Sequence, residues 1–358
     1  MRSEALSSEH IKIDDAVQIA KEAGLRYVND SKPGFTRVRN GDHYDYFDQH
    51  KKKIEDQNVI QRINRLIVPH IWDNVWICPY ERGHLQATGI DKKGRKQYRY
   101  HKNWDKARNE KKFDKMLQFG LVLPDIRKEI QSNLSIRSLT REKVLSTVIA
   151  LLDETLIRIG NKEYAKTNKT YGLTTLRNKH VKNLGGKVQL EFVGKKSIEK
   201  KVIVSDRRLA NIIKKCRELP GYDLFQYYNE DGHLTPIGSE DINGYLKQLS
   251  GEEITAKDFR TWGGSTIAIK ALMECEPCDD EKTIKKNIIE MTKKVSGSLG
   301  NTPTVCKGYY IHPIIIEKYS TKEIVTFAET HKEITTKGSE WLDGEEKLFL
   351  ELLRQSHS

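Results

Sequence analysis

The chain has 358 residues, of which 37% are hydrophobic, and its 62 lysines and arginines exceed its 50 acidic residues to give a net charge of +12. This length suits two or three domains, and the excess of positive charge suits a polyanionic partner, with nucleic acid as the leading candidate. No run of about eighteen apolar residues occurs, and the N-terminus is charged where a signal peptide has an apolar segment, so we expect neither a membrane span nor secretion.

Short strands and turns are predicted for the first part of the chain. The turn signals are NDSKPG at 29–34 and DKKG at 91–94, because glycine, proline, asparagine and aspartate favour turn geometries. We therefore predict a β-rich N-terminal domain over residues 1–101.

The pattern becomes helical after His101. Residues 102–120 and 139–157 carry apolar side chains at helical spacing, and Gly160 is predicted to end the second helix. These helices begin a second domain, which we predict to span residues 102–358.

One segment of the second domain interrupts the helical pattern. Val188, Leu190 and Phe192 alternate with polar residues, and the alternation returns at Val202 and Val204, which predicts a β-hairpin. The tip of this hairpin holds Lys195 and Lys196. From about Asp206 the helical pattern resumes, and a polar helix from Gly344 to Gln355 is expected near the end of the chain. The predicted fold class is α+β.

A polar hairpin strand, GRKQYRYH at 94–101, has two interpretations. Strand geometry places Lys96, Tyr98 and Tyr100 on one side and the remaining cations on the other. The strand could be a solvated edge that resists aggregation, or its mixed aromatic and cationic side chains could contact phosphates, sugars and bases. The residues alone leave both interpretations open.

The sequence predicts neither a metal nor a nucleotide cofactor. Cys275 and Cys278 have metal-ligand spacing, but a single pair cannot complete a four-ligand zinc site. Gly194 followed by Lys195 suggests a phosphate loop, but the required earlier glycine is replaced by Gln189 and no Ser or Thr follows the lysine directly.

The remaining constellation points to transesterification at phosphorus. Its members are Arg158 at a helix end, Lys195 on the hairpin, Arg260, and the adjacent tyrosines Tyr309 and Tyr310. A phosphodiester attacked by a tyrosine hydroxyl gains charge on two non-bridging oxygens, which planar guanidinium groups can hold by paired hydrogen bonds. A lysine can protonate the departing alkoxide.

These motifs resemble those of the type IB DNA topoisomerases of the small bacterial and poxvirus kind. The matching segments are RYVNDSKPGFTR at 26–37, VWICPYERGHLQATGIDKKGRKQYRYH at 75–101, RIGNKEYAKTNKTYGLTTLRNKHV at 158–181, FVGKK at 192–196, KDFRTWGG at 257–264 and LGNTPTVCKGYYIHP at 299–313. They agree in order and spacing over roughly residues 20–318.

The resemblance implies a C-shaped clamp around double-stranded DNA, in which the β-rich domain and a tyrosine-recombinase-like helical domain face the duplex. In that family a tyrosine forms a 3′-phosphotyrosyl intermediate, the free strand swivels, and the strand is resealed without ATP or metal. The resemblance therefore implies a monomer with no cofactor, which would act in the cytoplasm and, in a bacterial host, at the nucleoid.

The same resemblance assigns site residues. Tyr310 matches the nucleophile by its distance from the LG dipeptide, Arg158 and Arg260 match the transition-state arginines, and Lys195 matches the general acid. Asn301 stands where the poxvirus enzymes have histidine, and its amide can still donate a hydrogen bond to a non-bridging oxygen. The residues implied to contact DNA are Arg95, Gln97, Tyr98, Tyr100, Tyr164 and Lys257.

Two other functions remain open from the sequence. A tyrosine recombinase would use the same arginines, lysine and tyrosine, but the β-rich N-terminus and the Lys257-Asp258-Phe259 run before Arg260 argue against it. The other alternative is a basic DNA-binding protein without catalysis, which a covalent adduct with DNA would exclude.

Overall fold

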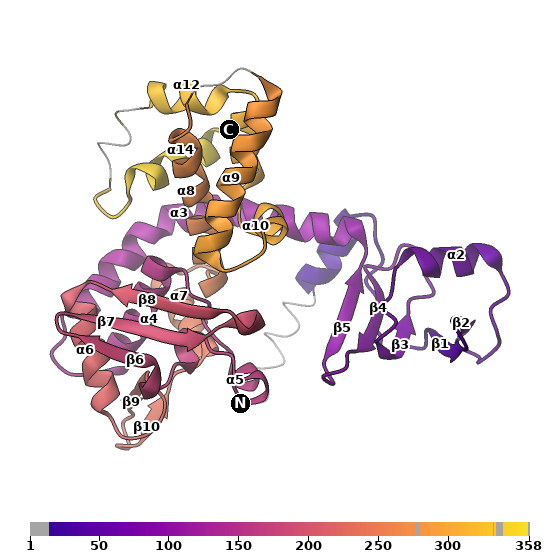
Figure 1. Ribbon diagram of the computed structural model, residues 1–358, viewed down its shortest axis with the longest axis horizontal. Coiled ribbons are helices and arrows are strands. Elements are labelled where there is room, and N and C mark those ends of the chain that lie inside the picture. The colour runs from indigo at the N-terminus through magenta and orange to yellow at the C-terminus, as the bar shows by residue number, and fades with distance from the viewer. Residues whose placement is uncertain (1–13, 277–279, 332, 334–338, 357–358) are drawn as a thin grey trace. The chain divides into compact units, whose positions relative to one another are not determined.

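The computed structural model describes residues 14–276, 280–331, 333 and 339–356. It divides into two compact units, Met1–Phe113 and Asp114–Ser358, which we describe separately (Figure 1). The division falls within α3 (Lys102–Leu134), so one continuous helix contributes residues to both units. The domain boundary expected at residue 101 stays a prediction.

The N-terminal unit contains a five-stranded antiparallel sheet in the order β2-β1-β3-β4-β5. Its strands are β1 (Phe35–Asn40), β2 (His43–Phe47), β3 (Asp73–Ile77), β4 (Leu85–Ile90) and β5 (Lys96–Tyr100). Ile63 of α2 (Gln57–Arg65) packs on Val75, Ile77 and Ala87 of the sheet. This sheet confirms the predicted β-rich character.

The prediction of strands and turns alone was wrong at two places in this unit, because residues 14–22 and α2 are helical. The side chain of Asp56 accepts a hydrogen bond from the Asn58 N–H and so caps α2. The other helix contributes Ala20 to a small core with Leu25 and Trp104. Each helix is short, so its apolar repeat spans too few residues to be distinguished from a short strand, although α2 itself is amphipathic.

The C-terminal unit is mainly helical, as predicted. The α-helices that the structure describes after α3 are α4 (Arg141–Thr155), α5 (Lys162–Asn168), α6 (Arg207–Glu218), α7 (Ser239–Ser250), α8 (Ala256–Met273), α9 (Glu281–Leu299), α10 (Pro303–Tyr309), α11 (Pro313–Ser320), α12 (Glu323–Thr330) and α14 (Gly344–Ser356). Helix α8 contacts α4, α7, α9, α11 and α14 and buries Phe259 and Trp262. It is therefore the central helix of this unit.

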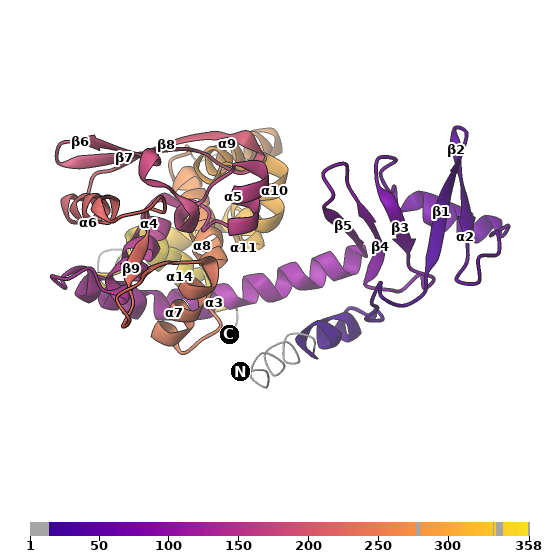
Figure 2. The ribbon, with the colours of Figure 1, turned by 90° about the horizontal axis from the view of Figure 1, so that it is seen from below.

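The predicted hairpin of the second unit is confirmed and belongs to a sheet in the order β6-β7-β8. The strands are β6 (Val181–Leu184), β7 (Lys187–Val193) and β8 (Glu199–Val204). Figures 1 and 2 both show that β7 ends and β8 begins at the end of the sheet on the side of α9 and α10, whereas α6 lies at the other end. The sheet thus carries its hairpin tip, η3 (Lys195–Ser197), to the side of the unit where those helices lie.

Three details of the second unit differ from the sequence prediction. A short hairpin, β9 (Gln226–Tyr228) and β10 (Leu234–Pro236), interrupts the expected helices. Helix α14 is not a polar surface helix, because it buries an apolar face that includes Phe349. Helix α4 ends at Thr155 rather than near Gly160, since Leu156 adopts a left-handed conformation with φ 53° and closes the helix.

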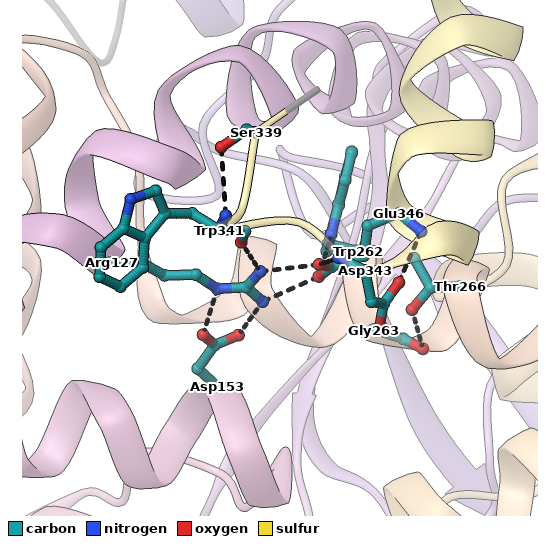
Figure 3. Close-up of polar contacts among 9 residues, drawn as sticks. All are labelled: Arg127, Asp153, Trp262, Gly263, Thr266, Ser339, Trp341, Asp343 and Glu346. Carbon is teal, nitrogen blue, oxygen red and sulfur yellow. Dashed lines mark hydrogen bonds and ion pairs between the residues drawn. The ribbon is translucent and has the colours of Figure 1, made fainter. Parts of the chain in front are cut away.

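Helix α14 is joined to the rest of the unit by a partly buried ion cluster (Figure 3). Arg127 of α3 donates hydrogen bonds to Asp153 of α4 at 2.7 and 2.9 Å, and to Glu346 of α14 at 2.7 and 2.8 Å. The indole N–H of Trp262 donates to Glu346 Oε1 at 2.9 Å. One guanidinium therefore bridges two carboxylates, and through Glu346 the C-terminal helix is fixed to α8.

We expect Arg127→Met to lower the free energy of unfolding by about 3 kcal/mol, because it leaves two largely buried carboxylates facing each other without a cation. The urea unfolding midpoint would measure this. Arg354→Met is the matched control, since the exposed Arg354 of α14 lies 3.6 Å from a single, partly buried carboxylate, Glu351, and its loss should cost less than about 1 kcal/mol. Equal midpoints for the two variants would show that the cluster does not stabilise the unit.

Among the described residues, no helix combines the length and apolar character that crossing a membrane requires.

Candidate active site

Arg260 lies on α8 and is almost fully buried, at 4% exposure. Its guanidinium donates hydrogen bonds to the carbonyl of Leu156 and, at 2.9 Å, to the carbonyl of Leu299. Burial lowers the pKa of Arg260 to about 10, and the nearby charge of Arg158 contributes to the same shift. Arg260 therefore joins the ends of α4 and α9, and no ion pair with a carboxylate is seen for it among the described residues.

Arg158 lies just beyond the end of α4 and reaches the segment after α9. It donates hydrogen bonds to the carbonyl of Gly300 at 3.3 Å and to Oδ1 of Asn301. Gly300 has φ +59° and closes α9, a conformation that glycine adopts without strain. Leu156 and Gly300, both in the left-handed conformation, thus end α4 and α9 close to the two arginines.

Two buried hydrogen-bond donors at this site have no partner within the described structure. They are Nε of Arg260 and Nδ2 of Asn301. An unpaired buried donor costs about 1–3 kcal/mol, so its presence in a native structure calls for an explanation. An oxyanion bound between the two residues would satisfy both donors.

Tyr310 follows α10, and its ring lies beside Arg260, with the guanidinium carbon 5.2 Å from the ring centroid. The nearby Tyr310 side chain opposes part of the lowering of the Arg260 pKa. A methyl group on Gly264 of α8 would lie 2.6 Å from the Tyr310 carbonyl oxygen, so only glycine allows this approach. The hydroxyl of Ser265 donates to the same carbonyl at 3.4 Å. Helix α8 therefore supplies Arg260 and also positions the Tyr310 backbone.

Lys195 is exposed in η3, at the tip of the β7–β8 hairpin. It borders a cavity of about 60 Å³ that is also lined by Arg158, Lys200, Arg260 and Gly300. No Asp or Glu lies among the described residues that line this cavity. Guanidinium and ammonium groups gathered without acids form a site for an anion such as phosphate.

The structure therefore brings together the five candidate catalytic residues of the sequence analysis in one unit. Both arginines donate hydrogen bonds to the chain where α9 ends, and Arg260 also donates to Leu156, two residues before Arg158. Asn301 contacts Arg158, Tyr310 lies beside Arg260, and Lys195 borders the shared cavity. Sequence reasoning missed Lys200 of β8. Its signal was the alternation of Val202 and Val204, which extends back to place residue 200 on the inward face of the strand.

Four of the candidate DNA-binding residues lie on or next to β5 in the N-terminal unit. The rings of Tyr98 and Tyr100 are stacked, with centroids 6.0 Å apart and planes 7° apart. Arg95 and Gln97 both donate to Asp91 Oδ2, at 2.9 and 3.0 Å. The strand thus presents the stacked rings of Tyr98 and Tyr100, and the carboxylate of Asp91 fixes the side chains of Arg95 and Gln97 by hydrogen bonds.

The other two candidates lie in the C-terminal unit. Tyr164 is 48% exposed on α5. Lys257 is exposed on α8, about one helical turn before Arg260. Both side chains are accessible to a ligand.

The described residues contain no group of three His, Cys, Asp or Glu side chains that could hold a metal ion. Cys275 lies at the end of α8 with its thiol directed to the carbonyl of Ala271, whereas Cys278 lies outside the described residues.

Known families match both units. Eukaryotic DNA topoisomerase I, catalytic core, matches residues 99–337, and bacterial DNA topoisomerase IB, N-terminal domain, matches residues 43–91. The DNA topoisomerase 1B of Acanthamoeba polyphaga mimivirus is 33% identical over 295 residues, 80% of this chain and 87% of the relative. The DNA topoisomerase I of monkeypox virus and the DNA topoisomerase 1B of vaccinia virus (strain Copenhagen) are 26% identical over 257 residues, 71% of this chain and 78% of each relative.

These similarities favour a topoisomerase over the recombinase and over the DNA-binding protein without catalysis. The catalytic-core match includes the anion site, by which we mean Arg158, Lys195, Lys200, Arg260, Asn301 and Tyr310. The mimivirus similarity extends over most of both chains. The chain belongs to the type IB DNA topoisomerases.

Proposed function

We propose that this enzyme relaxes supercoiled duplex DNA by cutting one strand through a 3′-phosphotyrosyl intermediate and resealing it, without ATP or metal. The observation that supports this proposal is the anion site in which Arg158 and Arg260, two unpaired buried donors and Tyr310 lie together. Such a site fits a phosphodiester whose charge increases during reaction.

In the proposed cleavage step, the Tyr310 oxygen attacks the scissile phosphorus and loses its proton to water. The bond from phosphorus to the 5′-oxygen breaks, and Lys195 gives that oxygen a proton. The 3′ end is then joined to Tyr310, and the other end is a free 5′-hydroxyl. Resealing is the reverse reaction, so the energy of the phosphodiester bond is retained and no nucleotide is consumed.

The arginines and Asn301 are proposed to stabilise the transition state. Arg158 and Arg260 would hold the two non-bridging oxygens, and Nδ2 of Asn301 would donate one further hydrogen bond. Asn301 is neutral at every pH, so we expect it to contribute no titration to the rate profile where a histidine would.

For substrate binding, we propose that the enzyme acts as a monomeric clamp on double-stranded DNA. Arg95, Gln97, Tyr98 and Tyr100 would contact the duplex from the N-terminal unit, and Tyr164 and Lys257 from the catalytic unit. We place this activity in the cytoplasm, at the nucleoid if the host is a bacterium. Relaxation of both positively and negatively supercoiled plasmid in EDTA without ATP tests the proposal, and a requirement for magnesium or ATP would contradict it.

Binding should weaken steeply with salt. A clamp that neutralises several phosphates releases their counterions, at about 0.9 per phosphate, so we expect log affinity to fall against log salt with a slope of about −4 or steeper. Equilibrium binding of a duplex across salt concentrations measures the slope.

Two variants of α8 make this test specific. Lys257→Ala should reduce the slope by about one, as expected when one phosphate contact is lost. Lys270→Ala is the control, because Lys270 is exposed on the same helix and faces Glu345 at 3.8 Å, and its slope should match wild type. A wild-type slope near zero would remove the electrostatic account of binding.

A further inference from the structure

Lys200 occupies an inward-facing position of β8, where the strand pattern calls for an apolar residue. Along β8, Glu199, Lys201 and Ile203 are exposed, whereas Lys200 and Val202 are partly buried and Val204 is fully buried. Alternation with period two therefore puts the lysine on the same face as the two valines. The ammonium group of a lysine there either extends out to water or stays partly buried, where it can bind a partner.

The ammonium group of Lys200 lies against the segment that closes α9. A methyl group on Gly300 would be 2.6 Å from Nζ and 2.8 Å from Cε of Lys200, so the missing side chain of Gly300 provides its space. Burial lowers the pKa of Lys200, and the positive charges of Arg158 and Arg260 lower it further. Its neighbour Lys201 instead forms an ion pair with Glu191 at 3.2 Å.

Four cations, Arg158, Lys195, Lys200 and Arg260, thus line one cavity, and no carboxylate lies among the described residues that line it. Their mutual repulsion destabilises the protein unless an anion enters. A purely structural lysine would relieve this repulsion by extending to solvent, as long cationic side chains commonly do. The position of Lys200 therefore has a physical reason only when a negatively charged group binds beside it.

We propose that Lys200 is a further catalytic residue, whose ammonium group binds a non-bridging oxygen of the scissile phosphate together with Arg158 and Arg260. The inference rests on the proposed function. It separates two lysines of the hairpin, because Lys195 acts on the bridging 5′-oxygen as a proton donor whereas Lys200 acts on the charge of the phosphate.

Single-turnover cleavage of a duplex by Lys200→Met tests this role, since methionine keeps the length of the side chain and removes the charge. Losing one hydrogen bond between charged groups should slow cleavage about 10- to 100-fold. Lys200→Arg should recover part of the rate. Lys201→Met is the matched control on the same strand and should stay within about twofold of wild type.

Modified phosphates distinguish this role from proton donation and from a merely structural one. On a duplex with a methyl group in place of one non-bridging oxygen, the defect of Lys200→Met should disappear for one of the two stereoisomers. On a duplex with sulfur in place of the bridging 5′-oxygen, the defect should persist. A defect that vanishes on the sulfur substrate would make Lys200 a proton donor, and an equal defect on every substrate would indicate a structural role; either result overturns the inference.

The controls also separate this inference from the proposed function. If wild type formed no adduct with any duplex, the proposed function would fail and the role of Lys200 with it. If wild type and Lys200→Met cleaved at the same rate, only the role of Lys200 would be contradicted.

Discussion

Replacing Tyr310 by phenylalanine is expected to abolish DNA relaxation and formation of the covalent adduct. Phenylalanine keeps the ring beside Arg260 but has no oxygen to attack phosphorus. Duplex affinity should stay within a few-fold of wild type, because binding rests on cations distributed over the chain. Plasmid relaxation, adduct trapping by denaturant and equilibrium binding would measure the three properties.

Tyr309→Phe is the matched control, because it removes the adjacent phenol. Tyr309 is the last residue of α10 and its side chain is 41% exposed, whereas the Tyr310 ring contacts Arg260. We expect this variant to retain activity. If Tyr309→Phe were inactive and Tyr310→Phe active, our assignment of the nucleophile would be wrong.

Lys195→Ala should slow cleavage by about 10²- to 10⁴-fold, the usual contribution of a positioned proton donor. An alkoxide is a poor leaving group, so loss of its proton donor raises the barrier to breaking the bond from phosphorus to the 5′-oxygen. The rate constant of a single turnover on a duplex measures this effect directly, without a contribution from product release.

A bridging-sulfur substrate separates proton donation from simple attraction of the phosphate. Sulfur departs as a thiolate, whose conjugate acid has a pKa near ~8.5 if cysteine is a guide, so it needs no proton from the enzyme. Lys195→Ala should cleave this substrate almost as fast as wild type. Arg158→Ala and Arg260→Ala should remain slow on it, because the arginines act on the non-bridging oxygens. An equal defect of Lys195→Ala on both substrates would leave Lys195 an electrostatic role only.

The sequence predicted the elements that hold the site where apolar residues are dense or alternate regularly. Helices α4 and α8 are buried on several sides and are therefore rich in apolar residues along their length, whereas β7 and β8 alternate between buried and exposed residues because one face of their sheet is buried. The end of α4 was placed too late, since Gly160 is a common stop signal. In the structure Leu156 ends the helix although it is not glycine, and its side chain packs in the space left by Gly263. That contact joins residues far apart in the sequence, so no local pattern could predict that α4 ends there.

Other features of the site depend on three-dimensional contacts that no local pattern contains. The resemblance to a family pointed to Asn301, but its hydrogen bond from Arg158 and its unpaired Nδ2 depend on how α9 ends relative to α4. Lys200 is one of several lysines in a basic segment. Only the approach of β8 to Gly300 distinguishes it from its neighbours.

The most direct test of the account is to identify the covalent link between enzyme and DNA. A duplex should be incubated with wild type in EDTA without ATP, the reaction stopped with denaturant, and the adduct digested and analysed by mass spectrometry. We predict a peptide in which Tyr310 carries the 3′-phosphate of the cleaved strand, together with a free 5′-hydroxyl on the other fragment. A link to Tyr309, a link to the 5′ end, or an adduct that forms only with a divalent metal would contradict the proposed mechanism.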